Sequence, residues 1–183
     1  SAARSLLENA NLIRKVRFPR QLVPLSVVAT QVVSFAAMTV IVLVLALAVR
    51  PDSRATAWLA LPVAALIVLF VAGLSLAIAS LNAVYRDVEF VVAAALLPWF
   101  FLTPILYSLE ELPGGIEDYP AVVDLLRWAN PLTPPLYALR DPLFYGVLPD
   151  WKDVLYLAGA AAGSLLLGAW VLSRIDDRIA AEL

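Results

Sequence analysis

Residues Leu22–Val49 read LVPLSVVATQVVSFAAMTVIVLVLALAV, a run that contains no charged side chain. A helix needs ~20 mostly apolar residues to cross a hydrocarbon layer ~30 Å thick, so this run is long enough to span a membrane. Three similar runs follow it along the chain. We therefore predict an all-α integral membrane protein whose four spans lie at 22–49, 55–85, 88–109 and 154–173.

The overall composition agrees with a chain that lies in lipid. Hydrophobic residues make up 62% and charged residues 15% of the 183 residues, against about 45–50% and about 25% in soluble domains. The absence of Cys and His excludes thiolate chemistry, disulfides, imidazole catalysis and the common zinc and haem sites. A net charge of −2 argues against nucleic acid as a partner.

The sequence offers no energy source for transport. The long apolar runs of the four predicted spans contain no acidic or basic side chain. A proton or ion relay through the membrane is therefore not expected. No phosphate-binding loop of the form G-x-x-x-x-G-K-[ST] is present. We expect no enzyme activity and no cofactor on this chain, and any transport would be driven by another polypeptide.

The basic residues predict the orientation in the membrane. Four crossings place segments 1–21 and 174–183 on one side, and the positive-inside rule makes that side the cytoplasm. A secretory leader is not expected, because residues 1–21 are polar and charged. The basic residues on the predicted inner side are Arg4, Arg14, Lys15, Arg17, Arg20, Arg86, Arg174 and Arg178, against Arg50, Arg54, Arg127, Arg140 and Lys152 outside.

Segment 110–153 differs from the spans because it is rich in proline and still largely apolar. Pro120 is expected to open a helix that runs to Ala129, and Pro134 and Pro135 another that runs to Tyr145. Both are too short to cross a membrane. We favour a re-entrant hairpin on the outer side over an ordered cap on the membrane surface.

Two cytoplasmic elements are candidate sites. Segment 9–21 is basic and amphipathic, which is typical of headgroup anchoring and also of docking to a cytoplasmic partner. The predicted loop between the second and third spans groups Tyr85, Arg86, Asp87 and Glu89. It is either a turn with a local ion pair or a hinge.

The third span contains Pro98 and Pro104, which indicate a bent helix or a functional kink. Trp99, Phe100 and Phe101 follow Pro98, and three consecutive rings cannot all face lipid from one side of a helix. At least one ring should face protein or a cavity. Core packing is favoured, and an aromatic wall that stacks on sugar rings is the alternative.

Gly159 and Gly163 form a G-x-x-x-G pattern in the last span. This pattern is typical of close helix packing in membranes, and a contact between two copies is the alternative.

Four stretches in order resemble the permease subunit of ABC exporters for O-antigen, teichoic acid and related polysaccharides, the type-2 ABC permeases. They are NLIRKVRFPR at 11–20, LNAVYRDV at 81–88, PWFFLTPILY at 98–107 and NPLTP at 130–134. The resemblance implies a six-helix permease of which this chain holds the last four helices. It also implies a homodimer in the bacterial cytoplasmic membrane, paired with an ATP-binding subunit that holds ATP and Mg. The implied substrate is a lipid-linked glycan, and membrane lipid surrounds the protein.

The same resemblance assigns roles to residues. It implies coupling to the ATP-binding subunit through Asn11, Arg14, Lys15, Arg17, Phe18, Pro19 and Arg20. It implies a channel lined by Trp99, Phe100, Phe101 and Tyr107. The outer gate would include Trp128, Asn130, Pro131 and Arg140.

The residues leave two alternative functions open. A type-2 permease for drugs or lipids would have an equally uncharged pore. A membrane scaffold or enzyme subunit is the other, although Asp87 and Glu89 alone are too few acids for a glycosyltransferase site.

Overall fold

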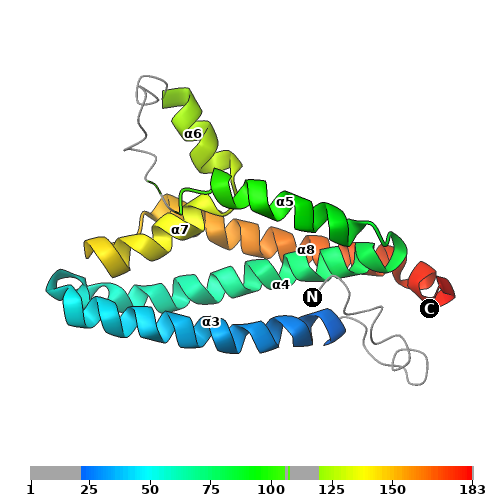
Figure 1. The fold of residues 1–183 in the computed structure, drawn as a ribbon, viewed down its shortest axis with the longest axis horizontal. Coiled ribbons are helices and arrows are strands. Elements are labelled where there is room, and N and C mark those ends of the chain that lie inside the picture. Colours follow the sequence, from blue (N-terminus) through cyan, green and yellow to red (C-terminus); the bar gives the residue numbers. More distant parts are fainter. Residues whose placement is uncertain (1–21, 106, 108–119, 183) are drawn as a thin grey trace.

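The computed structural model describes residues 22–105, 107 and 120–182, and within these residues all regular elements are helical. Figure 1 shows α3, α4 and α8 as long neighbouring helices, with α5 along the side of the bundle away from α3. The elements are α3 (Leu22–Val49), η2 (Pro51–Ala55), η3 (Ala57–Leu59), α4 (Ala60–Val84), α5 (Val88–Leu102), α6 (Pro120–Ala129), α7 (Thr133–Arg140), the π-helical turn η6 (Asp141–Tyr145) and α8 (Trp151–Glu182).

Three of the described helices are long and apolar enough to cross a membrane. They are Leu25–Val49, Ala57–Val84 and Trp151–Arg174, which coincide with three of the four predicted spans. The chain is thus a helical protein with several candidate membrane spans. The fourth crossing stays a prediction.

The third predicted span is shorter than expected, because α5 ends at Leu102 and not at 109. Its 15 residues extend about 22 Å at 1.5 Å per residue. Thr103 is extended, with φ −86° and ψ 130°. A residue that precedes proline avoids the helical region, so Pro104 ends the helix, whereas Pro98 lies inside it.

α4 and α8 pack closely at the centre of the described bundle. A Cβ atom on Gly73 would overlap the backbone of Ser164 and Leu165. A Cβ atom on Gly168 would lie 2.6 Å from the Gly73 carbonyl oxygen. The Ser164 hydroxyl donates to the Phe70 carbonyl oxygen at 3.0 Å, which gives this seam a polar contact as well.

The predicted G-x-x-x-G contact lies on another face of α8. A Cβ atom on Gly159 or Gly163 would have no described atom within 4 Å. Close packing within the described chain therefore uses Gly73 and Gly168 instead. The face of α8 that packs is the one that meets α4. The spacing of Gly159 and Gly163 in the sequence does not reveal which face that is.

The short helices after residue 119 pack on one end of the bundle. A core formed by Val63 and Phe70 of α4, Ala138 of α7, and Leu157 and Ala161 of α8 is buried there. We call the end that holds η2, η6 and the start of α8 the hairpin end, and α6 with α7 the hairpin. The α4–α5 turn lies at the opposite end (Figure 1).

The helix boundaries predicted for the hairpin hold closely. α6 runs from Pro120 to Ala129 as expected. α7 ends at Arg140 and continues as η6 to Tyr145, where Gly146 follows with φ 66°. A Cβ atom on Gly146 would lie 2.7 Å from the Asp52 carbonyl oxygen, so glycine satisfies both the turn and a close approach of η2.

Candidate functional site

α5 and the hairpin meet at a buried polar cluster, which we call the Trp99–Thr103–Asn130 junction. Trp99 Nε1 donates to Asn130 Oδ1 at 2.9 Å, and Asn130 Nδ2 donates to Thr103 Oγ1 at 2.9 Å. Thr103 Oγ1 in turn donates to the Trp99 carbonyl oxygen at 2.9 Å. Asn130 is 4% exposed and Thr103 2% exposed. The junction therefore connects α5 to the hairpin through Trp99 and Asn130, which are 31 residues apart in sequence.

The local sequence explains how these side chains converge. Trp99 and Thr103 are four residues apart and so lie on the same side of the helical end. Asn130 directly follows α6, and its Oδ1 also accepts a hydrogen bond from Leu132 N at 3.1 Å. Its carbonyl oxygen accepts from Thr133 N at 3.1 Å, which closes the turn into α7. Asn130 thus shapes the hairpin turn and holds it against α5.

An apolar groove of about 670 Å³ runs beside the junction between α5 and α6. Only the indole and amide groups of the junction bring polar atoms of side chains into its lining. The lining residues are Ala95, Pro98, Trp99, Leu102, Leu125, Leu126, Ala129, Asn130 and Pro131.

The four residues expected to line a channel separate into two groups. Trp99 is half-buried in the junction, which confirms that at least one of the three rings faces protein. Phe100 and Phe101 are exposed, and their rings form an edge-to-face pair with centroids 5.5 Å apart. The Tyr107 hydroxyl donates to the Phe101 carbonyl oxygen at 3.2 Å. Whether these rings face a channel stays a prediction.

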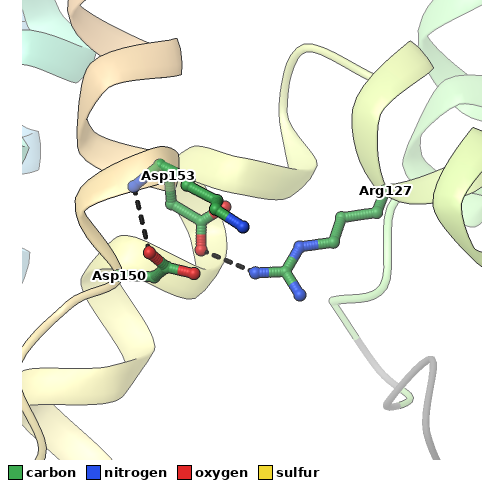
Figure 2. A network of polar contacts seen from close by, with 4 residues as sticks. Arg127, Asp150 and Asp153 are labelled. Atoms are coloured by element: carbon green, nitrogen blue, oxygen red, sulfur yellow. Dashed lines mark hydrogen bonds and ion pairs between the residues drawn. The ribbon is translucent and has the colours of Figure 1, made fainter.

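A second contact ties the hairpin to α8. Arg127 Nη2 of α6 donates to Asp153 Oδ2 at 2.9 Å, and the Asp153 side chain is fully buried (Figure 2). The Arg127 guanidinium also lies over the rings of Trp128 and Tyr137, at 5.3 and 5.1 Å from their centroids. The Tyr156 hydroxyl donates to the Trp128 carbonyl oxygen at 3.1 Å. The hairpin is therefore held to the end of α5 through Asn130 and to α8 through Arg127 and Trp128.

Asp153 is placed by the start of its helix. Asp150 precedes α8, and its carboxylate accepts a hydrogen bond from Lys152 N at 3.0 Å (Figure 2). This is the usual role of an aspartate at a helix N-cap. Asp153 follows one turn later on the side that faces Arg127.

The predicted outer-gate residues do not form one cluster. Trp128, Asn130 and Pro131 lie in the hairpin turn and its preceding helix. Arg140 lies at the end of α7, where it lines a separate groove with Arg50. Sequence reasoning missed Arg127, Asp153 and Tyr156 as contact residues, because no sequence spacing signals which distant side chains will meet.

At the opposite end, the predicted hinge is a short turn fixed by Asn82. Asn82 Oδ1 accepts a hydrogen bond from Glu89 N at 3.0 Å, and Asn82 is 1% exposed. Tyr85, Arg86 and Asp87 are exposed. The start of α5 is thus attached to the end of α4, and a hinge function stays a prediction.

The coupling residues expected at 11–20 lie outside the described residues. Within the described part of the chain, no group of three or more His, Cys, Asp or Glu side chains could hold a metal ion.

Comparison with known proteins identifies the family. The model of the ABC-2 type transporter family matches residues 2–144. The O-antigen export system permease protein RfbA of Myxococcus xanthus is 32% identical over 96% of this chain and 64% of its own length. RfbA of Klebsiella pneumoniae is 31% identical over 96% of this chain and 65% of its own length.

The chain thus spans a little under two thirds of the length of these relatives. The family match itself covers most of the chain, in agreement with the resemblance noted in the sequence and with the apolar helices described above. The chain therefore belongs to the ABC-2 type transporter family and is a multi-pass membrane protein.

Proposed function

We propose that this chain is the pore-forming permease of an ATP-driven exporter that moves a lipid-linked polysaccharide across the bacterial cytoplasmic membrane. Relatives named O-antigen export permeases, 31% and 32% identical to it, support the class of substrate. The observation that carries the mechanism is the Trp99–Thr103–Asn130 junction. It joins the aromatic end of α5 to a short hairpin by contacts that can break and form again.

The energy is proposed to come from a partner. Two copies of this permease would pair with two ATP-binding subunits, which hold ATP and Mg. The coupling segment at 11–20 would dock on those subunits and pass on their closure. The turn at 85–87 lies at the end of the bundle where α8 also ends, and Asn82 attaches it to α4 (Figure 1). Movement there would be passed along α5.

The junction is the proposed gate. A hydrogen bond contributes about 0.5–1.5 kcal/mol net, so the bonds of Asn130 to Trp99 and Thr103 are weak enough to be exchanged during a transport cycle. Separation of α5 from the hairpin would widen the groove of about 670 Å³ between them. The Arg127–Asp153 pair would keep the hairpin on α8 while α5 moves.

Aromatic rings are the proposed contacts with the glycan. Phe100 is 42% and Phe101 63% exposed on α5, beside the junction. Ring faces can stack on the apolar faces of sugars without binding them tightly, which suits a substrate that must pass through.

The proposed topology places the chain ends and the hairpin on opposite sides of the membrane. Both ends of the chain lie in the cytoplasm, and the hairpin end faces outward as a re-entrant gate. α5 with residues 103–107 makes the fourth crossing together with the hairpin, because α5 alone extends only about 22 Å. α3 and α5 would face lipid or the second copy, since they bury little within the described chain.

The experiment replaces the permease in cells that carry the complete exporter. Trp99→Phe keeps the ring and removes the donor to Asn130, and Asn130→Ala removes both bonds to α5. We expect surface glycan to fall severalfold at an equal amount of permease in the membrane, while lipid-linked glycan accumulates inside. Trp170→Phe is the matched control, since Trp170 is 56% exposed and lies on α8 away from the junction.

Normal surface glycan in both junction variants would remove the gate from the proposal. Reduced export of a lipid or drug with no change in glycan would contradict the proposed substrate class.

A further inference from the structure

A second groove at the hairpin end has a composition that the transport proposal does not use. It has a volume of about 420 Å³, and both charged residues in its lining are arginines, Arg50 and Arg140. Its walls come from α3, α7, η6 and the segment after α5. The other lining residues are Val42, Ile105, Leu136, Leu139, Leu143, Phe144 and Tyr145.

The two arginines lack the contacts that satisfy other arginines of the described chain. Arg54 Nε donates to the Leu47 carbonyl oxygen at 3.1 Å, Arg127 pairs with Asp153, and Arg174 lies over the Trp170 ring. Among the described residues, neither Arg50 nor Arg140 has such a side-chain partner. The acids closest to them in sequence, Asp52 and Asp141, do not line the groove. The groove therefore presents positive charge that its own lining leaves unneutralised.

The position of the groove matches a membrane interface. Arg50 follows the last residue of α3, whose 25-residue apolar stretch Leu25–Val49 is long enough to cross the membrane. A guanidinium at such a helix end lies at the level of the lipid headgroups. The apolar part of the groove extends from there along α3, as Val42 lies two turns before Arg50. A ligand that fits has a negative head at the arginines and a hydrocarbon part along Val42, Leu136 and Leu139.

We propose that this groove binds an anionic phospholipid, with its phosphate between Arg50 and Arg140 and an acyl chain along the apolar wall. The guanidinium group suits this ligand because its planar set of donors matches phosphate oxygens. The volume lies within the range of about 300–1,000 Å³ that is typical of small-molecule sites. Bound lipid would fill the space between α3 and η6 and so hold α7, which carries Arg140, against α3.

The test measures lipid binding by the purified transporter. The complete complex in detergent is stripped of lipid, and retained phosphatidylglycerol is then counted by native mass spectrometry over a titration. The variants are Arg50→Gln, Arg140→Gln and their combination, with Arg54→Gln as the control. Arg54 is an exposed arginine at the same end that does not line the groove.

Each arginine near a membrane surface contributes about 1 kcal/mol to anionic-lipid binding, which corresponds to about fivefold in affinity. We expect about fivefold weaker binding in each single variant and about 25-fold in the double variant. Arg54→Gln should bind as the wild type does. Val42→Phe narrows the apolar wall and keeps both charges, and it should also weaken binding of phosphatidylglycerol.

Two further ligands separate an anionic lipid from other sources of phosphate. Phosphatidylcholine has a head that is neutral overall, so it should bind the wild type more weakly than phosphatidylglycerol does. The double variant should bind these two lipids with equal affinity. Inorganic phosphate should raise the melting temperature of the complex far less than phosphatidylglycerol. An equal rise with inorganic phosphate would overturn the lipid proposal in favour of a free-anion site.

Equal losses in Arg54→Gln and Arg50→Gln would also overturn the proposal, because they indicate general surface attraction. The melting temperature of each variant without lipid shows whether it folds. Since the readout is binding and not export, failure here leaves the proposed transport function standing.

Discussion

α8 and α5 are attached to the bundle in opposite ways. α8 packs along α4 through a seam in which Gly73 and Gly168 allow backbone contact. α5 has no buried residue in the described chain, and its polar contacts lie at its two ends. Asn82 holds its first turn, and Asn130 holds its last. A close-packed seam resists sliding, whereas a helix held by a few exchangeable hydrogen bonds can move as a unit.

This difference in packing indicates where motion is expected. α4 and α8 form the fixed part of the described chain, and the hairpin belongs to it through Arg127, Asp153 and the core around Leu157. In the proposed mechanism, α5 is the movable part.

The largest effect is expected from Gly73→Ala. The new Cβ atom meets the backbone of Ser164 and Leu165, which cannot move aside without separating α4 from α8. Overpacking costs about 1–3 kcal/mol where side chains can give way, and because backbone atoms block this Cβ we expect a loss well beyond that range. A large fall in the amount of monodisperse complex and in its melting temperature is the expected result, measured by size-exclusion chromatography on heating.

Gly163→Ala is the matched control on the same helix, because a Cβ atom there would have no described atom within 4 Å. Within one chain it should be neutral or slightly stabilising. An equal loss in the control would show that α8 does not pack on α4 as described. Loss of the dimer alone would instead assign Gly163 to a contact between two copies.

The next effect concerns the pair that holds the hairpin. Arg127→Met leaves the Asp153 carboxylate buried without its cation, which typically costs about 3–5 kcal/mol in a buried pair. Because the Arg127 side chain is 28% exposed, we expect the lower part of that range. The melting temperature of the complex measures the loss.

Asp153→Asn together with Arg127→Met should recover part of the stability, since no buried charge is then left unpaired. If the double variant instead lost as much stability as Arg127→Met and Asp153→Asn lose together, the two residues would not act as one pair.

A smaller effect is expected at the junction. Trp99→Phe removes one of the two donors to Asn130 Oδ1, and because Leu132 N still donates to that oxygen the cost is about 0.5–1.5 kcal/mol. Hydrogen exchange should become faster at residues 130–133 and in the last turn of α5, with little change in α4 or α8. Unchanged exchange at both places would mean that the bond does not hold α5 to the hairpin.

The smallest effect on stability is expected for Phe101→Ala. Its ring is 63% exposed and contacts Phe100, so the melting temperature should change little. Export should nevertheless fall if the ring contacts the glycan. Leu155→Ala removes an equally exposed apolar side chain (63%) on α8 and should leave export unchanged. If both variants export normally, the aromatic wall has no role in transport.

Part of the fold could be read from the sequence because it depends on local rules. Uncharged runs located α3, α4 and α8, and Pro120 marked the first residue of α6. The end of α5 was missed for a local reason as well, since Pro104 was interpreted as a kink although its effect on Thr103 ends the helix. The seam at Gly73 and Gly168 was missed because a glycine pattern does not say which face meets a neighbour.

The candidate site was only half predictable. Trp99 and Asn130 were both singled out, but in separate groups, as channel and gate residues. Their hydrogen bond joins positions 31 apart, and Arg127 pairs with Asp153 across 26 positions. Such pairs depend on how the hairpin folds back, which no spacing in the sequence encodes.

In the proposed mechanism, α5 separates from the hairpin when substrate passes. The chain has no cysteine, so Leu102→Cys and Leu125→Cys introduce a single pair across the groove that both residues line. A bifunctional thiol reagent with a reducible bond links the two positions in the complete exporter. ATP hydrolysis and glycan export are then measured together, before and after reduction.

We predict that the linked transporter hydrolyses ATP but exports no glycan, and that reduction restores export. Either single-cysteine variant treated with the same reagent should continue to export. Full export by the linked double variant would contradict the proposed gate, because export would then not require α5 and the hairpin to separate.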